Sequence, residues 1–189
     1  METLREIVEL EYSIQSVLAS AKIADGFRVE ELRALGVFVE IRGGHGAQSL
    51  SFQMGPQRRF VTLFSNGTAT IRGCRSISEA QSLLEDVRRV LRRFAKVKKG
   101  KLRTAVQNIV ALADVGTQLD LVKLSQSLAS WDILYEPEQF PGLVLRPGEG
   151  KATLLVFSSG KLVIVGTRSE DELAAVLRET RPFLEASGR

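Results

Sequence analysis

The chain is poor in the residues from which most catalytic and metal sites are built. It has a single cysteine, Cys74, and a single histidine, His45. One cysteine excludes an intramolecular disulfide, and one histidine excludes most histidine-based metal sites and catalytic triads. His45 lies among three glycines, where a loop residue is a better interpretation than a catalytic base. We therefore expect a cytoplasmic protein of a reducing compartment, with no catalytic residues, no metal and no cofactor.

Long hydrophobic runs are also absent. No apolar stretch reaches the length of a membrane span, and residues 1–11 lack the basic and apolar order of a signal peptide. The composition is 44% hydrophobic and 25% charged, which is typical of a globular chain rather than a disordered or membrane protein. We expect no membrane partner.

Acidic residues are missing from one long stretch, residues 87–113. The same stretch holds nine basic residues: Arg88, Arg89, Arg92, Arg93, Lys96, Lys98, Lys99, Lys101 and Arg103. Such a block is either the solvated face of a helix and its tail, or a surface that contacts nucleic acid or an acidic protein. The sequence leaves both interpretations open.

Two parts of the chain repeat one another. IQSVLASAK (14–22) matches VQNIVALAD (106–114), and FVTLFSNGTATIRGCRS (60–76) matches ATLLVFSSGKLVIVGTRS (152–169). An internal duplication of this kind determines the architecture, so it is considered before any single motif. Each copy predicts a strand, a short helix, four strands and a long helix.

Local signals place these elements. Alternating and β-branched runs predict strands at 12–21, 37–42, 49–54, 58–65, 68–73 and 106–114, with further strands between 144 and 165, and Asn66-Gly67 predicts a hairpin. Short helices are expected at 1–11, 28–35 and 120–128. Long helices begin at the capping boxes Ser76–Glu79 and Ser169–Glu172, and their apolar stripes run to Phe94 and Phe183.

The predicted fold class is α+β. We expect two pseudo-symmetric repeats whose antiparallel sheets join into one sheet of about ten strands, with the long helices on its convex side and a concave face left bare. The expected divisions are an N-terminal extension at 1–11, a first repeat at 12–97, a basic linker at 98–103 and a second repeat at 104–187. The face without helices is apolar, and such a surface is costly unless it binds something.

The second repeat resembles the TATA-box-binding protein family in its archaeal form. The matching motifs are VQNIVA (106–111), YEPEQFPGLV with a following arginine (135–146), and LLVFSSGKLV with the following glycine and serine (154–169). The resemblance covers residues 101–187 well, residues 12–97 only in outline, and residues 1–11 not at all. It implies that the two repeats form a saddle with a curved antiparallel sheet and helices on the convex side. It also implies a transcription initiation factor, not an enzyme, that binds and bends A·T-rich promoter DNA through the minor groove in an archaeal, nucleoid-associated setting.

The resemblance also implies roles for residues of the second repeat. Phe140 and Phe157 match a pair of wedges that enter the base stack. The expected minor-groove contacts are Asn108, Val110, Leu155, Val163 and Val165, although the family commonly has threonine in place of Val165. The expected phosphate contacts are Arg146, Ser159, Lys161 and Arg168. Glu136 and Glu138 match an acidic loop that contacts transcription factor B.

The first repeat departs further from the family. Phe64 matches a wedge, but its partner position falls near Ala47 in a glycine-rich loop. The matching groove residues are Ser16, Leu18 and Arg72, with Thr62 in place of Leu155. Arg75 is an expected phosphate contact, whereas Gln53 and Thr68 replace Arg146 and Lys161. These changes indicate either drift after duplication, with only the fold kept, or an altered groove preference in which Arg72 enters the minor groove.

Two functions from different classes are consistent with this pattern. The first is a divergent TATA-box-binding factor whose partners are double-stranded promoter DNA, transcription factor B and, through them, the RNA polymerase machinery. The alternative is a paralogue that regulates through protein contacts, keeps its transcription factor B surface, and binds DNA weakly or differently. The sequence also leaves open a homodimer formed through the concave face.

Overall fold

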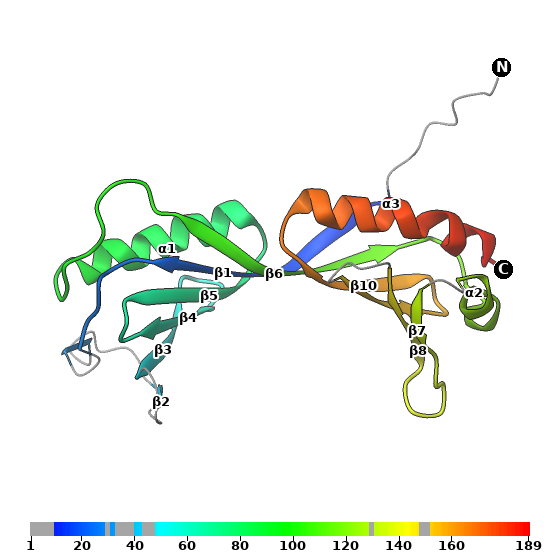
Figure 1. Cartoon of the computed structure of the whole chain (residues 1–189), viewed down its shortest axis with the longest axis horizontal. Coiled ribbons are helices and arrows are strands. Elements are labelled where there is room, and N and C mark those ends of the chain that lie inside the picture. Colours follow the sequence, from blue (N-terminus) through cyan, green and yellow to red (C-terminus); the bar gives the residue numbers. More distant parts are fainter. Residues whose placement is uncertain (1–9, 29–30, 33–39, 43–47, 129–130, 148–151) are drawn as a thin grey trace, which may run out of the picture. The chain divides into compact units, whose positions relative to one another are not determined.

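The computed structural model describes residues 10–189 except 29–30, 33–39, 43–47, 129–130 and 148–151 (Figure 1). The chain divides into two compact units. One contains Gln15–Asn108, and the other contains Met1–Ile14 with Ile109–Arg189. We call β1 to α1 the first half and β6 to α3 the second half, and describe each by itself.

The described part of the first half is a five-stranded antiparallel sheet with one long helix. Its elements are β1 (Tyr12–Lys22), β2 (Glu40–Arg42), β3 (Ser49–Met54), β4 (Arg59–Phe64), β5 (Thr68–Cys74) and α1 (Ile77–Leu91), and the strand order is β2-β3-β4-β5-β1.

The described part of the second half has the same arrangement and one further helix. Its elements are β6 (Thr104–Asp114), α2 (Leu121–Ser127), β7 (Asp132–Leu134), β8 (Gly142–Arg146), β9 (Thr153–Phe157), β10 (Lys161–Thr167) and α3 (Glu170–Ala186). The strand order is β6-β10-β9-β8-β7, again antiparallel throughout.

The same hairpin turn recurs in both halves and depends on glycine. Gly67 has φ +88°, and a Cβ atom there would lie 2.2 Å from the carbonyl oxygen of Ala24. Gly160 has φ +87°, and its Cβ would lie 2.2 Å from the carbonyl oxygen of Thr117. Glycine alone suits a left-handed backbone against which another carbonyl packs so closely. The predicted turn at Asn66-Gly67 is therefore present between β4 and β5.

Both long helices begin at the predicted capping boxes. Ser76 Oγ accepts from Glu79 N at 3.0 Å, and Ser169 Oγ accepts from Glu172 N at 3.1 Å. Each glutamate reaches back to a backbone N–H, of Arg75 and Arg168 respectively. Such reciprocal bonds satisfy N–H groups that the first helical turn leaves without partners. The first helix ends at Leu91, earlier than the predicted stripe, and Phe94 lies in the turn beyond it.

In each half one face of the sheet is covered by the helix and the other is open. Val61, Ile71 and Leu63 are fully buried together with Leu84 and Leu91 of α1, and Leu154, Val156 and Ile164 are buried with Leu173 and Leu184 of α3. Because side chains alternate along a strand, the residues between these buried ones lie on the open face.

Two predicted helices lie largely outside the described residues. The helix expected at 1–11 lies outside the described residues except for Leu10 and Glu11, which have no regular structure. Of the helix expected at 28–35, only Arg28, Glu31 and the buried Leu32 are described, and the last two form a short 3-10 turn. In the described part of the chain, no helix is both long and apolar enough to cross a membrane.

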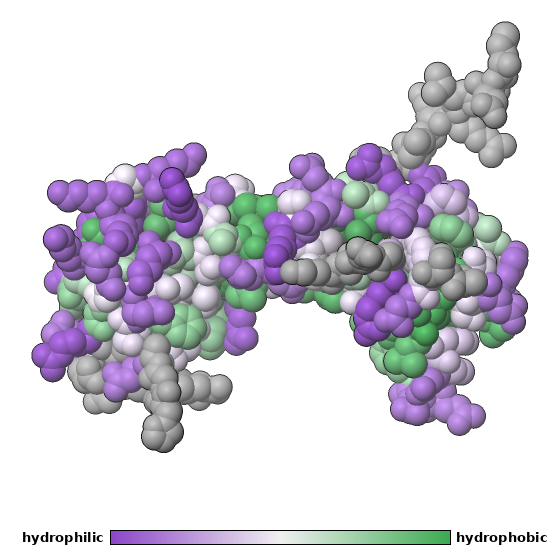
Figure 2. Space-filling model, in the orientation of Figure 1, coloured by the Kyte–Doolittle hydropathy of each residue, from purple (hydrophilic) through white to green (hydrophobic). Residues whose placement is uncertain are grey.

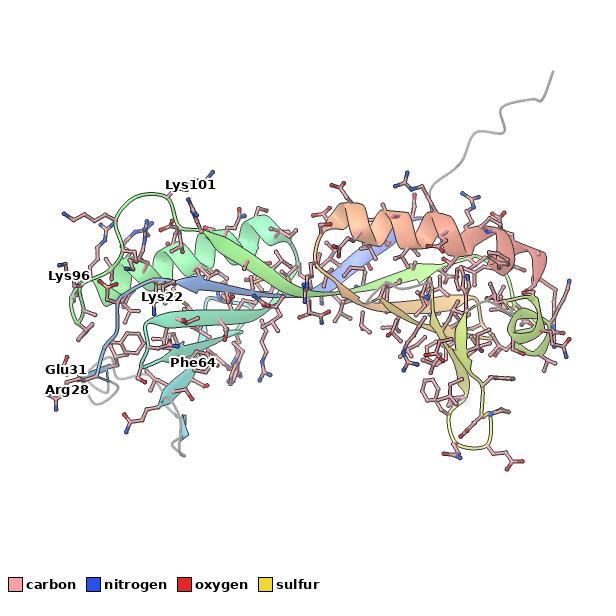
Figure 3. The ribbon with its side chains drawn as sticks, viewed as in Figure 1. Lys22, Arg28, Glu31, Phe64, Lys96 and Lys101 are labelled. Carbon is pink, nitrogen blue, oxygen red and sulfur yellow. The ribbon has the colours of Figure 1, made fainter. Side chains whose placement is uncertain are left out.

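In the basic block, Arg88 has a structural role. Arg88 is buried, forms an ion pair with Glu85 at 2.5 Å, and donates to the carbonyl oxygens of Lys98 and Gly100 at 3.1 and 2.7 Å. It therefore fixes the loop that follows α1. The other basic residues of the block are exposed, and Figure 3 places Lys96 and Lys101 in this loop, on the side of the sheet that α1 covers.

Candidate nucleic-acid interface

The open face of the second half is an aliphatic floor. The register aligns Leu112, Val163, Leu155 and Val144 in a row that crosses β6, β10, β9 and β8. Asn108, Val110 and Val165 lie on the same face, partly exposed, and the bulge between Val165 and Thr167 adjoins them. A hollow of about 700 Å³ lies over the floor and is lined by Tyr12, Pro141, Phe157, Lys161 and Val163, among others.

Two aromatic rings stand at the edge of the floor. Phe140 and Phe157 meet edge to face, with ring centroids 5.8 Å apart and an interplanar angle of 65°. Phe140 keeps 36% of its surface exposed. Gly142 lies beneath the pair, and a Cβ atom there would come within 2.7 Å of the Phe140 ring and 3.1 Å of the Phe157 ring. The missing side chain at Gly142 therefore makes room for the two rings.

The turn that carries Phe140 is short and hydrogen-bonded. The carbonyl oxygen of Glu136 accepts from the N–H groups of Gln139 and Phe140, both at 2.9 Å. Glu136 and Glu138 are exposed on this turn, and neither forms an ion pair with a residue that the structure describes. Leu134, just before it, is 48% exposed. Figure 2 shows hydrophobic residues gathered over β7 and β8, next to the hydrophilic tip of this turn.

The predicted phosphate contacts of the second half are all exposed. They are Arg146, Ser159, Lys161 and Arg168. Arg146 at the end of β8 donates to Asp132 at 2.7 Å, and both side chains remain about half exposed or more. An exposed ion pair of this kind is worth little and is easily exchanged for another anion.

The open face of the first half has the same register but different chemistry. The row that crosses β1, β5, β4 and β3 consists of Ser20, Thr70, Thr62 and Ser51. Each corresponds in register to one of the four aliphatic residues of the second half. The hydroxyls of Ser51 and Thr62 hydrogen-bond to each other at 2.9 Å, and Ser20 Oγ accepts from Gln107 Nε2 at 3.0 Å. A hydroxyl row thus replaces an aliphatic row.

Arg72 also lies on this face, as its spacing from Thr70 predicts. Its guanidinium carbon lies 4.2 Å from the centroid of the Phe60 ring, which is its cross-strand partner. Stacking on an aromatic ring holds a guanidinium in place while its N–H groups stay available at the edges. The corresponding pair in the second half is Val165 and Thr153.

The other predicted residues of the first half that the structure describes lie on its sheet or just beyond a strand end. Ser16 Oγ accepts from Gly73 N at 3.2 Å, beside the β1 bulge. Leu18 and Phe64 are partly exposed, and Figure 3 shows Phe64 on the sheet, away from α1. Arg75 donates to the side chain of Gln15. Ala47, the predicted position of the partner wedge, lies outside the described residues.

Comparison with known proteins agrees with this geometry. The family model described as transcription factor TFIID (or TATA-binding protein, TBP) matches residues 103–186. The TATA-box-binding protein of Methanothrix thermoacetophila is 32% identical over 187 residues, which cover 96% of this chain and 99% of that protein. That of Aeropyrum pernix is 38% identical over 141 residues, covering 72% and 67% of the two chains. The chain belongs to the TATA-box-binding protein family.

A solved structure extends the comparison to the fold. Methanococcus jannaschii TBP superposes with a TM-score of 0.80 at 28% identity, covering 93% of this chain and 99% of that one. This confirms the predicted fold class and the archaeal type of the resemblance. The chain is therefore a transcription factor of the TATA-box-binding type and not an enzyme. The family model matches the second half alone, the half with the aliphatic floor.

Sequence reasoning missed three features of the site. Phe60 supports Arg72, Gly142 makes room for the wedge rings, and Ser20 and Ser51 complete the hydroxyl row. Only the last left a usable signal. Writing the two repeats in register across four strands would have paired these serines with Leu112 and Val144.

One nucleophile and one charged cluster lie outside this interface. Burial raises the pKa of the Cys74 thiol to about 11, so the thiol is protonated and inert at neutral pH. Burial also acts to raise the pKa of Glu79, but hydrogen bonds from Arg59 and from the backbone N–H of Arg75 outweigh it and hold the pKa below its ordinary value. In the described residues, no three histidine, cysteine, aspartate or glutamate side chains gather as metal ligands would.

Proposed function

We propose that the chain binds A·T-rich promoter DNA in the minor groove through its open sheet faces, and bends it. The observation that carries the proposal is the aliphatic floor of the second half with its paired Phe140 and Phe157 rings. An A·T minor groove presents acceptors and no amino group, so an apolar floor with few donors fits it. Asn108 on this floor supplies a side-chain amide that can donate to those acceptors.

The two rings are the proposed wedges. The TATA-box-binding family is itself a standard case of minor-groove binding by apolar wedge insertion. Phe140 is exposed at a fixed turn, and Phe157 supports it at the edge of the floor. Arg146, Ser159, Lys161 and Arg168 around the floor would contact phosphates and set the register of the protein on the duplex.

The first half would contribute less to this binding. Smooth bending of a site costs on the order of 1–6 kcal/mol, and that cost depends on the sequence being bent. Phe64 is the one described wedge of the first half, and Gln53 and Thr68 stand where the second half has Arg146 and Lys161. Arg72, held on Phe60, is the residue that would enter the groove there. We therefore expect weaker or differently specific TATA binding than a standard family member shows.

Titration of a fluorescently labelled A·T-rich duplex tests the proposal. We expect salt-dependent binding and an increase in energy transfer between dyes at the duplex ends, because the bend brings the ends together. A standard archaeal factor on the same duplex gives the reference. Equal affinity and equal bend in the two proteins would contradict the expected weakness of the first half, and no binding at any A·T-rich duplex would overturn the proposal.

The acidic turn is the proposed contact for transcription factor B. Glu136 and Glu138 project from a hydrogen-bonded turn, and neither pairs with a cation among the described residues. Charge reversal of both, Glu136→Arg and Glu138→Arg, should abolish capture of transcription factor B while DNA binding stays within a few-fold. Reversal of Glu170 and Asp171 at the start of α3 is the matched control. Unchanged capture in the turn variant would count against this surface.

The hydroxyl row and Arg72 favour one alternative function. A paralogue that keeps the acidic turn and has lost productive DNA binding would regulate initiation by sequestering transcription factor B. The titration above separates the two functions. Binding to transcription factor B without binding to any duplex is the result expected of the regulator.

A further inference from the structure

The four hydroxyl residues of the first half form one continuous row. Ser20, Thr70, Thr62 and Ser51 are cross-strand neighbours in that order along the row, and all four lie on the open face. Their counterparts Leu112, Val163, Leu155 and Val144 are all aliphatic. All four positions of the row therefore differ between the halves in the same chemical direction, aliphatic in the second half and hydroxyl in the first.

The chemical difference concerns one group in the minor groove. A G·C pair differs there from an A·T pair by the 2-amino group of guanine, which is a hydrogen-bond donor. An aliphatic floor desolvates this amino group and offers it no acceptor, and an unsatisfied buried donor is costly. A hydroxyl has two acceptor lone pairs and one rotatable donor. It can therefore accept from the guanine amino group or donate to the acceptors of an A·T pair.

The existing hydrogen bonds leave this capacity in place. The Ser51–Thr62 hydrogen bond uses the proton of one hydroxyl and one lone pair of the other. The bond from Gln107 uses one lone pair of Ser20. The hydroxyl of Thr70 makes no side-chain hydrogen bond with any residue that the structure describes. Acceptors therefore remain along the whole row.

We propose that the hydroxyl row of the first half accepts the guanine 2-amino group, so that this half binds a half-site containing G·C pairs. The second half, with its aliphatic row, accepts A·T pairs only. The protein then reads an asymmetric element and binds it in one orientation. This inference rests on the proposed minor-groove binding, but it specifies which base pairs each half accepts.

Three duplexes of one length test it without a need to know the orientation in advance. The first has A·T pairs in both half-sites, the second has one G·C pair at the centre of one half-site, and the third has one G·C pair in each. Because the protein can turn its first half toward the single G·C pair, the second duplex should bind within about 3-fold of the first, whereas a mismatched pair typically costs on the order of 5- to 150-fold. The third should lose that larger factor, since one G·C pair must face the aliphatic row.

Modified bases identify the group responsible. Inosine·C lacks the 2-amino group, and its use in place of both G·C pairs should restore binding to the third duplex. 2,6-Diaminopurine·T adds the amino group to an A·T pair and should reproduce the G·C pattern. Failure of inosine to restore binding would mean that DNA deformability causes the loss, and would overturn the proposed contact.

Isosteric variants assign the contact to the row. Thr62→Val with Thr70→Val removes two hydroxyls without a change of shape. It should widen the difference in affinity between the first and second duplexes to the factor that separates the first and third duplexes in the wild type. Val163→Thr is the matched control in the second half and should raise binding to the third duplex. Circular dichroism melting checks that each variant is folded.

The outcomes separate this inference from the proposed function. No binding to the all-A·T duplex overturns both. The inference alone is overturned if the all-A·T duplex binds and the second duplex loses as much affinity as the third. That result would show that both halves reject a G·C pair.

Discussion

The two halves of this chain have the same strands in the same order, yet their open faces differ at nearly every position. The floor of the second half is Leu112, Val163, Leu155 and Val144, and that of the first is Ser20, Thr70, Thr62 and Ser51. The covered faces differ far less, because both are aliphatic and fully buried. The core keeps its hydrophobic character for folding, while the open face is free to change with what it binds.

Charge separates the halves as well. Residues 12–103 contain 17 basic and 7 acidic residues, a formal charge of +10, and residues 104–189 contain 8 basic and 11 acidic residues, a formal charge of −3. Nine of the 17 basic residues of the first half fall in the block at 88–103, at the end of α1 and in the loop after it, and Figure 3 shows two of them, Lys96 and Lys101, on the covered side of the sheet. This charge therefore attracts a polyanion over a distance but does not replace Arg146 and Lys161 at the rim.

The wedges should give the largest difference between the halves. Phe157→Ala removes half of the ring pair, and we expect an affinity loss of about 5- to 150-fold, as for removal of an aromatic that stacks on a base. Phe64→Ala in the first half should lower the affinity by less than about a third of that factor, because no second described ring supports Phe64. Gel-shift titration on an A·T-rich duplex measures both. Equal losses would show that the halves share the bend evenly.

Gly142 offers a milder test of the same ring pair. Gly142→Ala places a methyl group within 2.7 Å of the Phe140 ring, so the exposed ring must turn away. We expect a smaller bend and roughly tenfold weaker binding, the equivalent of about 1.4 kcal/mol, with little change in thermal stability. Ser49, the counterpart in the first half, already has a side chain, and Ser49→Ala is the control. A bend unchanged in Gly142→Ala would mean that the rings do not act as a pair.

The sequence predicted the elements well because their signals are local. The capping boxes at Ser76 and Ser169 and the turn at Gly67 each depend on residues within a few positions of one another. The hydroxyl row and the Arg72–Phe60 stack depend on register between strands instead. A single strand shows Thr62 between two buried residues, and nothing in that strand indicates what lies beside it. The roles of Phe140, Glu136 and the rim residues came from resemblance alone.

Stability should also distinguish the halves at the starts of their long helices. Glu79 receives a hydrogen bond from Arg59 at 2.7 Å in addition to its capping bond, and Glu172 forms an ion pair with no described residue. Glu79→Gln should cost about 1–2 kcal/mol, somewhat less than a fully buried charged hydrogen bond, and Glu172→Gln about 0.5 kcal/mol. Chemical denaturation at pH 7 measures both changes.

The pH dependence follows from the direction of the Glu79 shift. Its pKa is lower in the folded chain than the ordinary 4.5, so its contribution is full above that value and is lost as the pH falls through the folded pKa. The difference between wild type and Glu79→Gln should therefore disappear in acid. A difference that persists at pH 2 would show that packing, not charge, explains the variant.

The smallest expected effect concerns one buried hydroxyl. Thr167 at the end of β10 is 1% exposed, and its Oγ1 has no hydrogen-bond partner among the described residues. Its counterpart in the first half is Cys74 at the end of β5, a buried side chain that needs no such partner. Thr167→Val keeps the shape and removes the unpaired hydroxyl, so it should stabilise the fold by about 1 kcal/mol. Cys74→Ser is the reverse change in the first half and should destabilise by a similar amount. If denaturation showed Thr167→Val to be destabilising instead, the hydroxyl would have a partner in solution, and the halves would differ less in their cores than their side chains indicate.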